Sequence, residues 1–161
     1  MQASQQCVLL VEDNVHDVIL LKHALQKIGF PCFLHVAENG ERAKSYIRGE
    51  GEFADRTEYP FPKMVLTDLK MPKMDGFELV EWMRADPKLS SVFIMVLSAS
   101  PLEEDRLKAL QLGVNAFFTK PQHSEDFVPL VKFIRERWSR NLNALSGAST
   151  EPTNEAGGIS I

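Results

Sequence analysis

Four short apolar runs in this chain each end at a polar side chain, and this feature constrains the fold more than any other. The runs and the polar residues after them are 8–11 before Glu12 and Asp13, 64–67 before Asp68, 93–97 before Ser98, and 116–119 before Lys120. Short apolar runs without alternation are typical of strands that are buried on both faces of a parallel sheet. Ligands of such sheets bind beyond the carboxyl ends of the strands. We therefore expect the five polar side chains to meet in one crevice.

Helical patterns separate these runs, so that strand and helix alternate along the chain five times. A weaker strand is expected at Phe33–Ala37, and its shortness suits the edge of a sheet. Parallel strands that are joined by right-handed helical crossovers form a doubly wound sheet. The predicted fold class is therefore α/β, with a five-stranded parallel sheet and five helices on its two faces.

Capping residues indicate where the helices begin. Asn14, Asn39 and Asp75 each precede a helical apolar pattern, and such side chains accept hydrogen bonds from the free N–H groups of a first turn. Ser100 followed by Pro101 predicts a fourth helix with Ser100 as its cap and Pro101 at its first position. We regard this as the clearest helix start in the sequence.

The 161 residues, 44% of them hydrophobic, are enough for one sizeable core but too few for a second functional domain after it. Pro129 falls about one turn after the expected cap Ser124, so the last helix should have an irregular first turn. From Ser139 onward the chain is mostly small and polar, a composition that does not order itself. The expected organisation is an N-terminal extension at 1–6, one domain at 7–140 and a disordered tail at 141–161.

Residues 49–62 are dense in glycine, proline and charge, and they sustain neither a helical nor a strand period. A long loop is expected there, before the third strand. Loops of this length are often functional. We expect Phe53, Tyr59 and Phe61 to fold back over the core, with contact to a partner protein as the second interpretation.

The net charge of −4 gives no electrostatic reason to bind nucleic acid or an anionic membrane. No apolar stretch approaches the length of a membrane span, and residues 1–6 lack the pattern of a secretory leader. We expect a cytoplasmic protein. Cys7 and Cys32 stand at the start of two predicted strands and are interpreted as buried core thiols; a redox role stays open if the strands are neighbours.

The five polar residues at the strand ends suit magnesium-assisted phosphoryl chemistry. Clustered carboxylates such as Glu12, Asp13 and Asp68 repel one another, and a hard divalent cation, Mg²⁺ above all, is their natural occupant. A carboxylate can attack phosphorus, and Asp68, at the centre of the sheet, is the candidate nucleophile. Lys120 would neutralise the transferred oxygens, and the hydroxyl of Ser98 would donate to them.

Two features near Lys120 remain open at this stage. A cis bond between Lys120 and Pro121 would turn the chain sharply and aim the ammonium inward, but the sequence leaves both isomers open. Phe117, three residues before Lys120, is either a core aromatic or a side chain that moves when Ser98 approaches a phosphate.

These residues together resemble the receiver domain of two-component response regulators. The resemblance covers 8–138, and the residues that carry it are Glu12-Asp13, Asp68-Leu69-Lys70-Met71-Pro72, Gly76, Ser98-Ala99 and Lys120-Pro121. It implies a flavodoxin-like sheet of strand order 2-1-3-4-5. This chain has Phe117 where many members have tyrosine, and Glu12 in place of aspartate is a common variant.

The resemblance also implies residue roles. Asp68 would accept a phosphoryl group from a sensor histidine kinase, and the metal would be bound by Glu12, Asp13, Asp68 and the backbone carbonyl of Lys70. Ser98 and Lys120 would bind the phosphoryl oxygens. Ser98 and Phe117 would form a switch that changes partner binding, so the protein would be no turnover enzyme beyond its own phosphoryl transfer and autodephosphorylation.

The apparent absence of an output domain, the 49–62 loop and the ending at 133–138 are similar to single-domain regulators associated with bacterial phytochromes. This similarity implies a light-regulated histidine kinase as donor, and a homodimer through the fourth helix, fifth strand and fifth helix. The downstream protein target is not identified by the sequence.

Three other classes of protein fit less well. Flavin-binding proteins of this fold need a phosphate-cradling loop where Glu12 and Asp13 stand. A haloacid-dehalogenase-type phosphatase would need a second aspartate where Lys70 stands. Histidine phosphotransfer proteins are helical bundles, and no role is assigned to the four histidines, His16, His23, His35 and His123.

Overall fold

Five parallel strands form one sheet in the order β2-β1-β3-β4-β5. The computed structural model describes residues 7–30, 32–121 and 123–145. The strands are β1 Cys7–Val11, β2 Phe33–Ala37, β3 Met64–Thr67, β4 Phe93–Ser98 and β5 Ala116–Thr119. The predicted fold class and strand order are confirmed.

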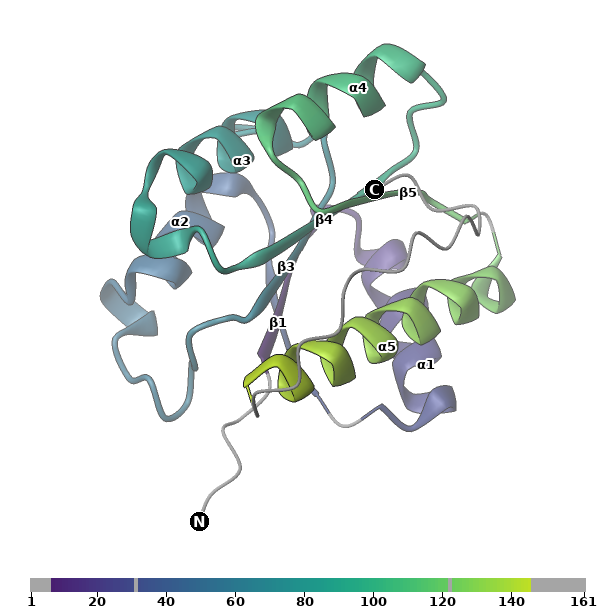
Figure 1. The fold of residues 1–161 in the computed structure, drawn as a ribbon, viewed down its shortest axis with the longest axis horizontal. Coiled ribbons are helices and arrows are strands. Elements are labelled where there is room, and N and C mark those ends of the chain that lie inside the picture. Colours follow the sequence, from purple (N-terminus) through teal and green to yellow (C-terminus); the bar gives the residue numbers. More distant parts are fainter. Residues whose placement is uncertain (1–6, 31, 122, 146–161) are drawn as a thin grey trace.

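Two layers of helices cover the sheet (Figure 1). Helices α1 and α5 lie on one face, and α2, α3 and α4 lie on the other. The α-helices are α1 Val15–Ile28, α2 Gly40–Arg48, α3 Gly76–Ala85, α4 Glu103–Leu112 and α5 Val128–Leu145, and the 3₁₀ helices are η1 Gly51–Phe53, η2 Pro87–Leu89 and η3 Ser124–Phe127. None of the helices in the described part of the chain is both long and apolar enough to cross a membrane.

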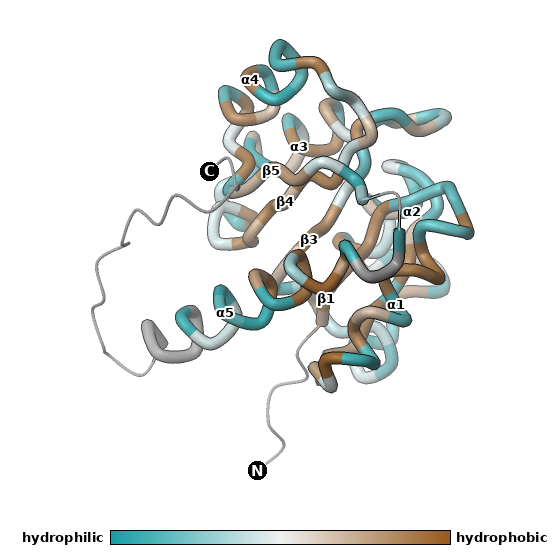
Figure 2. The backbone as a smooth tube through the Cα atoms, turned by 90° about the vertical axis from the view of Figure 1, so that its right-hand side faces the viewer, coloured by the Kyte–Doolittle hydropathy of each residue, from teal (hydrophilic) through white to brown (hydrophobic). Residues whose placement is uncertain are grey.

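The core has two halves because successive side chains of a strand point to opposite faces of the sheet. In β1, Val8 and Leu10 pack on the α1 and α5 side, whereas Leu9 and Val11 pack toward α2 and α3. Figure 2 shows the result as hydrophobic strands inside and more hydrophilic helix segments outside. Burial on both faces explains why the strands appear in the sequence as continuous apolar runs.

Three of the predicted helix caps are confirmed. The side-chain oxygen of Asn14 accepts from the His16 N–H at 2.9 Å. Asn39 does the same for Arg42 and Asp75 for Glu78, each at 2.9 Å. These caps fix the start of each helix directly beyond the carboxyl ends of the strands.

The predicted start of α4 is wrong. The helix begins at Glu103 rather than at Pro101, and its N-cap is Leu102, which makes no side-chain cap. The Ser100 hydroxyl accepts from the Leu102 N–H at 3.3 Å and donates to Asp105 at 2.5 Å. Because that hydroxyl closes a local turn two residues on, Pro101 lies in the turn and not in the helix.

The irregular start of the last helix is confirmed, because η3 precedes α5 there. Helix α5 continues to Leu145, beyond the expected end of the domain at 140, and the domain boundary itself stays a prediction. Extending a formed helix adds one hydrogen bond for each residue fixed, so the helix persists beyond Trp138, its last buried side chain among the described residues. The expected extension at 1–6 and the rest of the expected tail, 146–161, lie outside the described residues.

The 49–62 loop covers the core, as expected, through two of its three aromatic side chains. Phe53 is buried, and Tyr59 packs edge-on against it with ring centroids 5.2 Å apart. Arg56 joins the loop to α2, because its guanidinium donates to the backbone carbonyls of Tyr46 and Ile47 at the helix end. The prediction is wrong for Phe61, which is 43% exposed.

Neither cysteine forms a disulfide. Cys7 is buried, its sulfur lies 3.3 Å from the Tyr46 hydroxyl, and burial raises the pKa of its thiol. Burial also raises the pKa of Cys32 to about 11. The prediction of a buried core thiol is confirmed for Cys7, whereas Cys32 is only partly buried and packs against the core. The raised pKa values keep both thiols protonated and unreactive.

Candidate functional site

The sheet itself positions the polar residues at its carboxyl edge. Inter-strand hydrogen bonds continue one residue beyond the strands: Glu12 N–H donates to Ala37 O at 2.9 Å, and Asp68 N–H donates to Val11 O at 3.1 Å. The Lys120 N–H donates to Ser98 O at 2.7 Å. Each side chain therefore leaves a backbone position that is fixed by a neighbouring strand.

The Lys120 ammonium is the centre of the site. Its nitrogen lies 2.8 Å from a Glu12 oxygen, 2.9 Å from Asp68 and 2.9 Å from Asp17. The side chain is only 9% exposed. Burial lowers the pKa of Lys120, but the hydrogen bonds that its ammonium donates to the three carboxylates outweigh burial and raise the pKa above the ordinary value, so the site holds a permanent cation. The Lys120–Pro121 bond is trans, so no cis bond is needed to aim this side chain.

Asp68 presents a carboxylate that is held by two different donors. One oxygen accepts from the backbone N–H of Leu69 at 2.7 Å, and the other accepts from Lys120. The residue is 8% exposed, and its backbone carbonyl accepts from the Thr67 hydroxyl at 2.9 Å. An anion with fixed orientation and limited access to water has the properties of a nucleophile for group transfer.

Glu12 is more deeply buried than Asp68. One of its oxygens accepts from the backbone N–H of Asn14 at 3.1 Å, and the other meets Lys120. Burial raises the pKa of Glu12, and the hydrogen bonds from Lys120 and Asn14 oppose that shift without cancelling it. A cation beside this carboxylate would favour its charged form.

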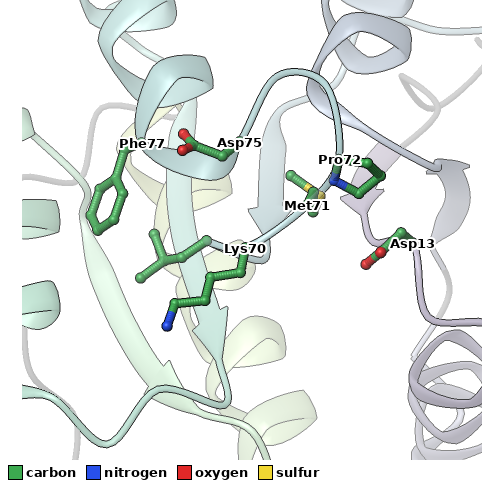
Figure 3. A pocket seen from close by; sticks show the side chains of 7 residues that line it. Asp13, Lys70, Met71, Pro72, Asp75 and Phe77 are labelled. Atoms are coloured by element: carbon green, nitrogen blue, oxygen red, sulfur yellow. The ribbon is translucent and has the colours of Figure 1, made fainter.

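Three carboxylates converge in the manner that a metal site requires. Oxygen atoms of Glu12, Asp13 and Asp68 all lie within 4.8 Å of one another. Such a set of hard oxygen donors, one of them exposed, fits Mg²⁺, which keeps several of its waters. Asp13 borders an open hollow, with Lys70 and the start of α3 on the other side (Figure 3). The role of the Lys70 carbonyl as a ligand stays a prediction.

Gly76, at the start of α3, allows the backbone to pass close to Asp68. A Cβ atom at this position would lie 2.0 Å from the Asp68 carbonyl oxygen, far inside van der Waals contact. The Gly76 N–H donates to Leu69 O at 3.0 Å. The site therefore needs glycine here for close approach rather than for an unusual backbone angle.

The two predicted switch residues are both buried. Ser98 is 1% exposed at the end of β4, and its hydroxyl accepts from the Ser100 N–H at 3.1 Å. Phe117 is 5% exposed, pairs with Val96 across the two strands, and belongs to the core on the α2, α3 and α4 side. Its packing is thus established, while a switching role for either residue stays a prediction.

Asp17 is a site residue that the sequence analysis missed. Its carboxylate is one of the three that contact the Lys120 ammonium. A usable signal was present: α1 begins directly beyond β1, so an acidic side chain in its first turn lies over the carboxyl edge of the sheet.

The comparisons with known proteins agree with this geometry. The family model for the response regulator receiver domain matches residues 8–132. A protein described as the probable methanogenesis regulatory protein FilR2, from Methanothrix harundinacea, is 33% identical over 131 residues, which are 81% of this chain and 82% of FilR2. Response regulator Rcp1 of Synechocystis is 30% identical over 131 residues, 81% of this chain and 87% of Rcp1.

Solved structures show the same similarity. The phosphorylated cyanobacterial phytochrome response regulator RcpA is 34% identical, with a TM-score of 0.75 over 90% of this chain and 97% of its own. The Mn²⁺-bound form of Rcp1 is 28% identical, with a TM-score of 0.73 over 92% of this chain and 99% of its own. The match of the family model over most of the chain, together with the acidic crevice and the sheet order, shows that this chain belongs to the response regulator receiver domain family.

Proposed function

We propose that this chain is a cytoplasmic response regulator that accepts a phosphoryl group on Asp68 from a sensor histidine kinase, with Mg²⁺. The observation that carries the proposal is the Asp68 carboxylate, which faces the Lys120 ammonium at 2.9 Å and stands beside Glu12 and Asp13. The family places the chain in two-component signalling, and the geometry supports Asp68 as the acceptor within it.

The transfer exchanges one bond to phosphorus for another. An oxygen of Asp68 attacks the phosphorus of a phosphohistidine, the P–N bond breaks, and its electron pair returns to the imidazole of the kinase. Lys120 donates to an oxygen of the transferred group, and Ser98 donates to another. When held by Glu12, Asp13 and Asp68, Mg²⁺ supplies charge neutralisation at the acceptor.

The cycle ends when water attacks the phosphorus of the acyl phosphate and the bond from phosphorus to the Asp68 oxygen breaks, which releases inorganic phosphate and regenerates the Asp68 carboxylate. We assign Lys70 a place in this step only through its backbone carbonyl, as a metal ligand on the rim of the hollow. The protein thereby acts on its own phosphoryl group and on no separate substrate.

Phosphorylation would act on partners by shifting an equilibrium between two conformations. Ser98 would move toward the phosphoryl oxygens, and Phe117, two residues before Thr119, the strand partner of Ser98, would repack. Helix α4 suits a responsive surface, because its buried contacts rest mainly on Ala109 and its N-cap residue makes no side-chain hydrogen bond. The downstream protein would read this surface.

The donor kinase that we propose is a phytochrome, on the strength of the similarity to RcpA. Phosphotransfer should be compared between an autophosphorylated phytochrome kinase and a histidine kinase without a light sensor. Faster transfer from the phytochrome supports this choice, and equal or slower transfer contradicts it.

We also propose a homodimer through α4, β5 and α5. Leu102 and Leu107, both 48% exposed, supply apolar surface at α4. Light scattering after size-exclusion chromatography, with and without beryllofluoride, should detect the dimer; Leu107→Glu should shift the chain toward monomer.

The deciding experiment is incubation with acetyl phosphate and Mg²⁺, followed by intact mass spectrometry. The chain should gain one phosphoryl group, and Asp68→Asn or chelation of Mg²⁺ should abolish the gain. Asp75→Asn is the matched control, because it removes a carboxylate from the same hollow and keeps a capping side chain for α3. A phosphoryl group that persists on Asp68→Asn would overturn the assignment.

A further inference from the structure

We infer that Asp17 is a positioning residue that orients the Lys120 ammonium toward Asp68 and the transferred phosphoryl group. The inference rests on the proposed function and adds a residue to it. Asp17 lies in the first turn of α1, and its carboxylate oxygen is 2.9 Å from the Lys120 nitrogen. Its side chain is 18% exposed, so the contact is partly shielded from water.

The ammonium of Lys120 has three N–H donors, and its nitrogen lies within 2.9 Å of an oxygen of each of three carboxylates. Glu12 and Asp68 also belong to the group of acids that fits a metal, and Asp68 is the proposed acceptor. Asp17 is not in that group. Among the described partners of Lys120, Asp17 is therefore the one whose contact can persist while the other two engage a metal or a phosphoryl group.

A persistent contact matters because a lysine side chain is long and flexible. Without Asp17, the ammonium would lose one of three anchors at the moment when a second anchor, Asp68, changes its chemical state. A charge placed even slightly away from the transferred oxygens stabilises the transition state less well.

Asp17 also has an ordinary structural interpretation. A carboxylate in the first turn of a helix interacts favourably with the helix dipole, whatever Lys120 does. The two interpretations predict different measurements. An interaction of Asp17 with the helix dipole changes the stability of the fold and does not depend on Lys120. A positioning role changes the rate of phosphorylation and is lost when Lys120 is replaced. A double-mutant cycle separates them.

The experiment measures the rate of phosphorylation by acetyl phosphate, and the binding of beryllofluoride by ¹⁹F NMR, in Asp17→Asn, Lys120→Gln and the double variant. Asp17→Asn should lower the phosphorylation rate by about tenfold in the native background and by less than about twofold when Lys120 is already replaced. Asp17→Asn should weaken beryllofluoride binding in the same proportion. Asp17→Glu, which keeps a carboxylate, should recover part of both losses.

The matched control is Glu41→Gln. Glu41 is an exposed acidic residue in the first turn of α2, so its replacement removes a comparable dipole interaction without touching Lys120. Its phosphorylation rate should match that of the native chain.

The outcomes distinguish the two proposals. If the native chain takes no phosphoryl group on Asp68, the proposed function fails, and the role of Asp17 fails with it. If Asp68 is phosphorylated but Asp17→Asn is unchanged or faster, the inference about Asp17 alone is overturned. An equal loss in the native and Lys120→Gln backgrounds, or no recovery with Asp17→Glu, also overturns it.

Discussion

Two cations that are at least partly buried stand at opposite ends of the sheet, and their partners differ in kind. Lys120, at the carboxyl end, is surrounded by carboxylates. Arg84, at the end of α3, donates to neutral acceptors near the amino ends of β4 and β5. These acceptors are the carbonyls of Leu89, Ser90, Val92 and Gly113 and the side-chain oxygen of Asn115, at 2.8–3.3 Å.

This difference in partners distinguishes a functional site around Lys120 from a structural framework around Arg84. The neutral partners of Arg84 are backbone carbonyls and an amide whose charge never changes, and burial lowers the pKa of Arg84 because no carboxylate offsets it. The partners of Lys120 are anions that a metal or a phosphoryl group can engage. The charge balance at the carboxyl end of the sheet, around Lys120, can therefore change, while the contacts of Arg84 at the amino end stay the same. Three predictions test this division, and a fourth concerns a residue that belongs to neither end.

The largest effect is expected at Lys120. Lys120→Met should slow phosphorylation of Asp68 by about 100-fold or more, because a preorganised donor to the transferred oxygens is lost. The rate with acetyl phosphate and Mg²⁺ checks this prediction. Arg84→Met is the comparison and should stay within about twofold of the native rate in the folded protein; a comparable loss in both variants would refute the division.

The second-largest effect is a loss of stability, and it is expected at the amino end of the sheet, where Arg84 lies. Arg84→Met should lower the free energy of unfolding by about 3 kcal/mol, because several partly buried acceptors lose their donor. Urea denaturation followed by circular dichroism measures it. Arg137→Met is a suitable control, since that guanidinium lies over the rings of Phe93 and Phe133, with its central carbon 6.0 and 5.4 Å from the ring centroids. A loss in Arg84→Met no larger than in the control would contradict a scaffold role.

A third prediction tests whether steric crowding, without any change of charge, disturbs the candidate site at the carboxyl end of the sheet. Gly76→Ala places a methyl group 2.0 Å from the Asp68 carbonyl oxygen, and relief requires movement of the backbone. The variant should lose about 2 kcal/mol of stability and also phosphorylate more slowly. Urea denaturation and the acetyl phosphate assay on the same samples test both parts. Gly29→Ala, whose added methyl meets nothing within 4 Å, separates crowding from backbone strain.

The smallest effect concerns pH and belongs to neither end. His35, on β2, lies between the rings of Tyr46 and Tyr59, and burial lowers its pKa below 6.5 against an opposing effect of Glu58. A lowered pKa means that the neutral ring stabilises the fold above about pH 6.5, and that this contribution is lost as the pH falls.

The urea midpoint should therefore fall between pH 7.5 and 5.0 by less in His35→Phe than in the native chain. His23→Gln, at an exposed position, is the matched control. Identical pH profiles for His35→Phe and the native chain would contradict the prediction.

Much of the fold was predictable because its signals are local. The apolar runs that became β1, β3 and β4 are buried on both faces, so they need no alternation to be recognised. Asn14, Asn39 and Asp75 act within their own turns, and their caps are confirmed. The convergence of Glu12, Asp13 and Asp68 followed from the parallel sheet.

Predictions were wrong where a competing contact decided the outcome. Ser100 had the pattern of a helix cap, but its hydroxyl closes a turn onto Leu102 and bonds Asp105 instead. Phe61 had the composition of a core residue and lies exposed. In each case several local arrangements were compatible with the sequence, and packing selected one.

The sequence by itself determined the alternation of strand and helix and the acidic edge of the sheet, since these depend on apolar patterning and on the geometry of parallel strands. The strand order was predicted from the resemblance to a known family. Tertiary structure alone decided which carboxylates share the Lys120 ammonium. Asp17 and Lys120 are 103 positions apart in the chain. Their contact forms because α1 and β5 are both fixed on the same sheet, and no local pattern records which first-turn acid will face a lysine from the far end of the fold.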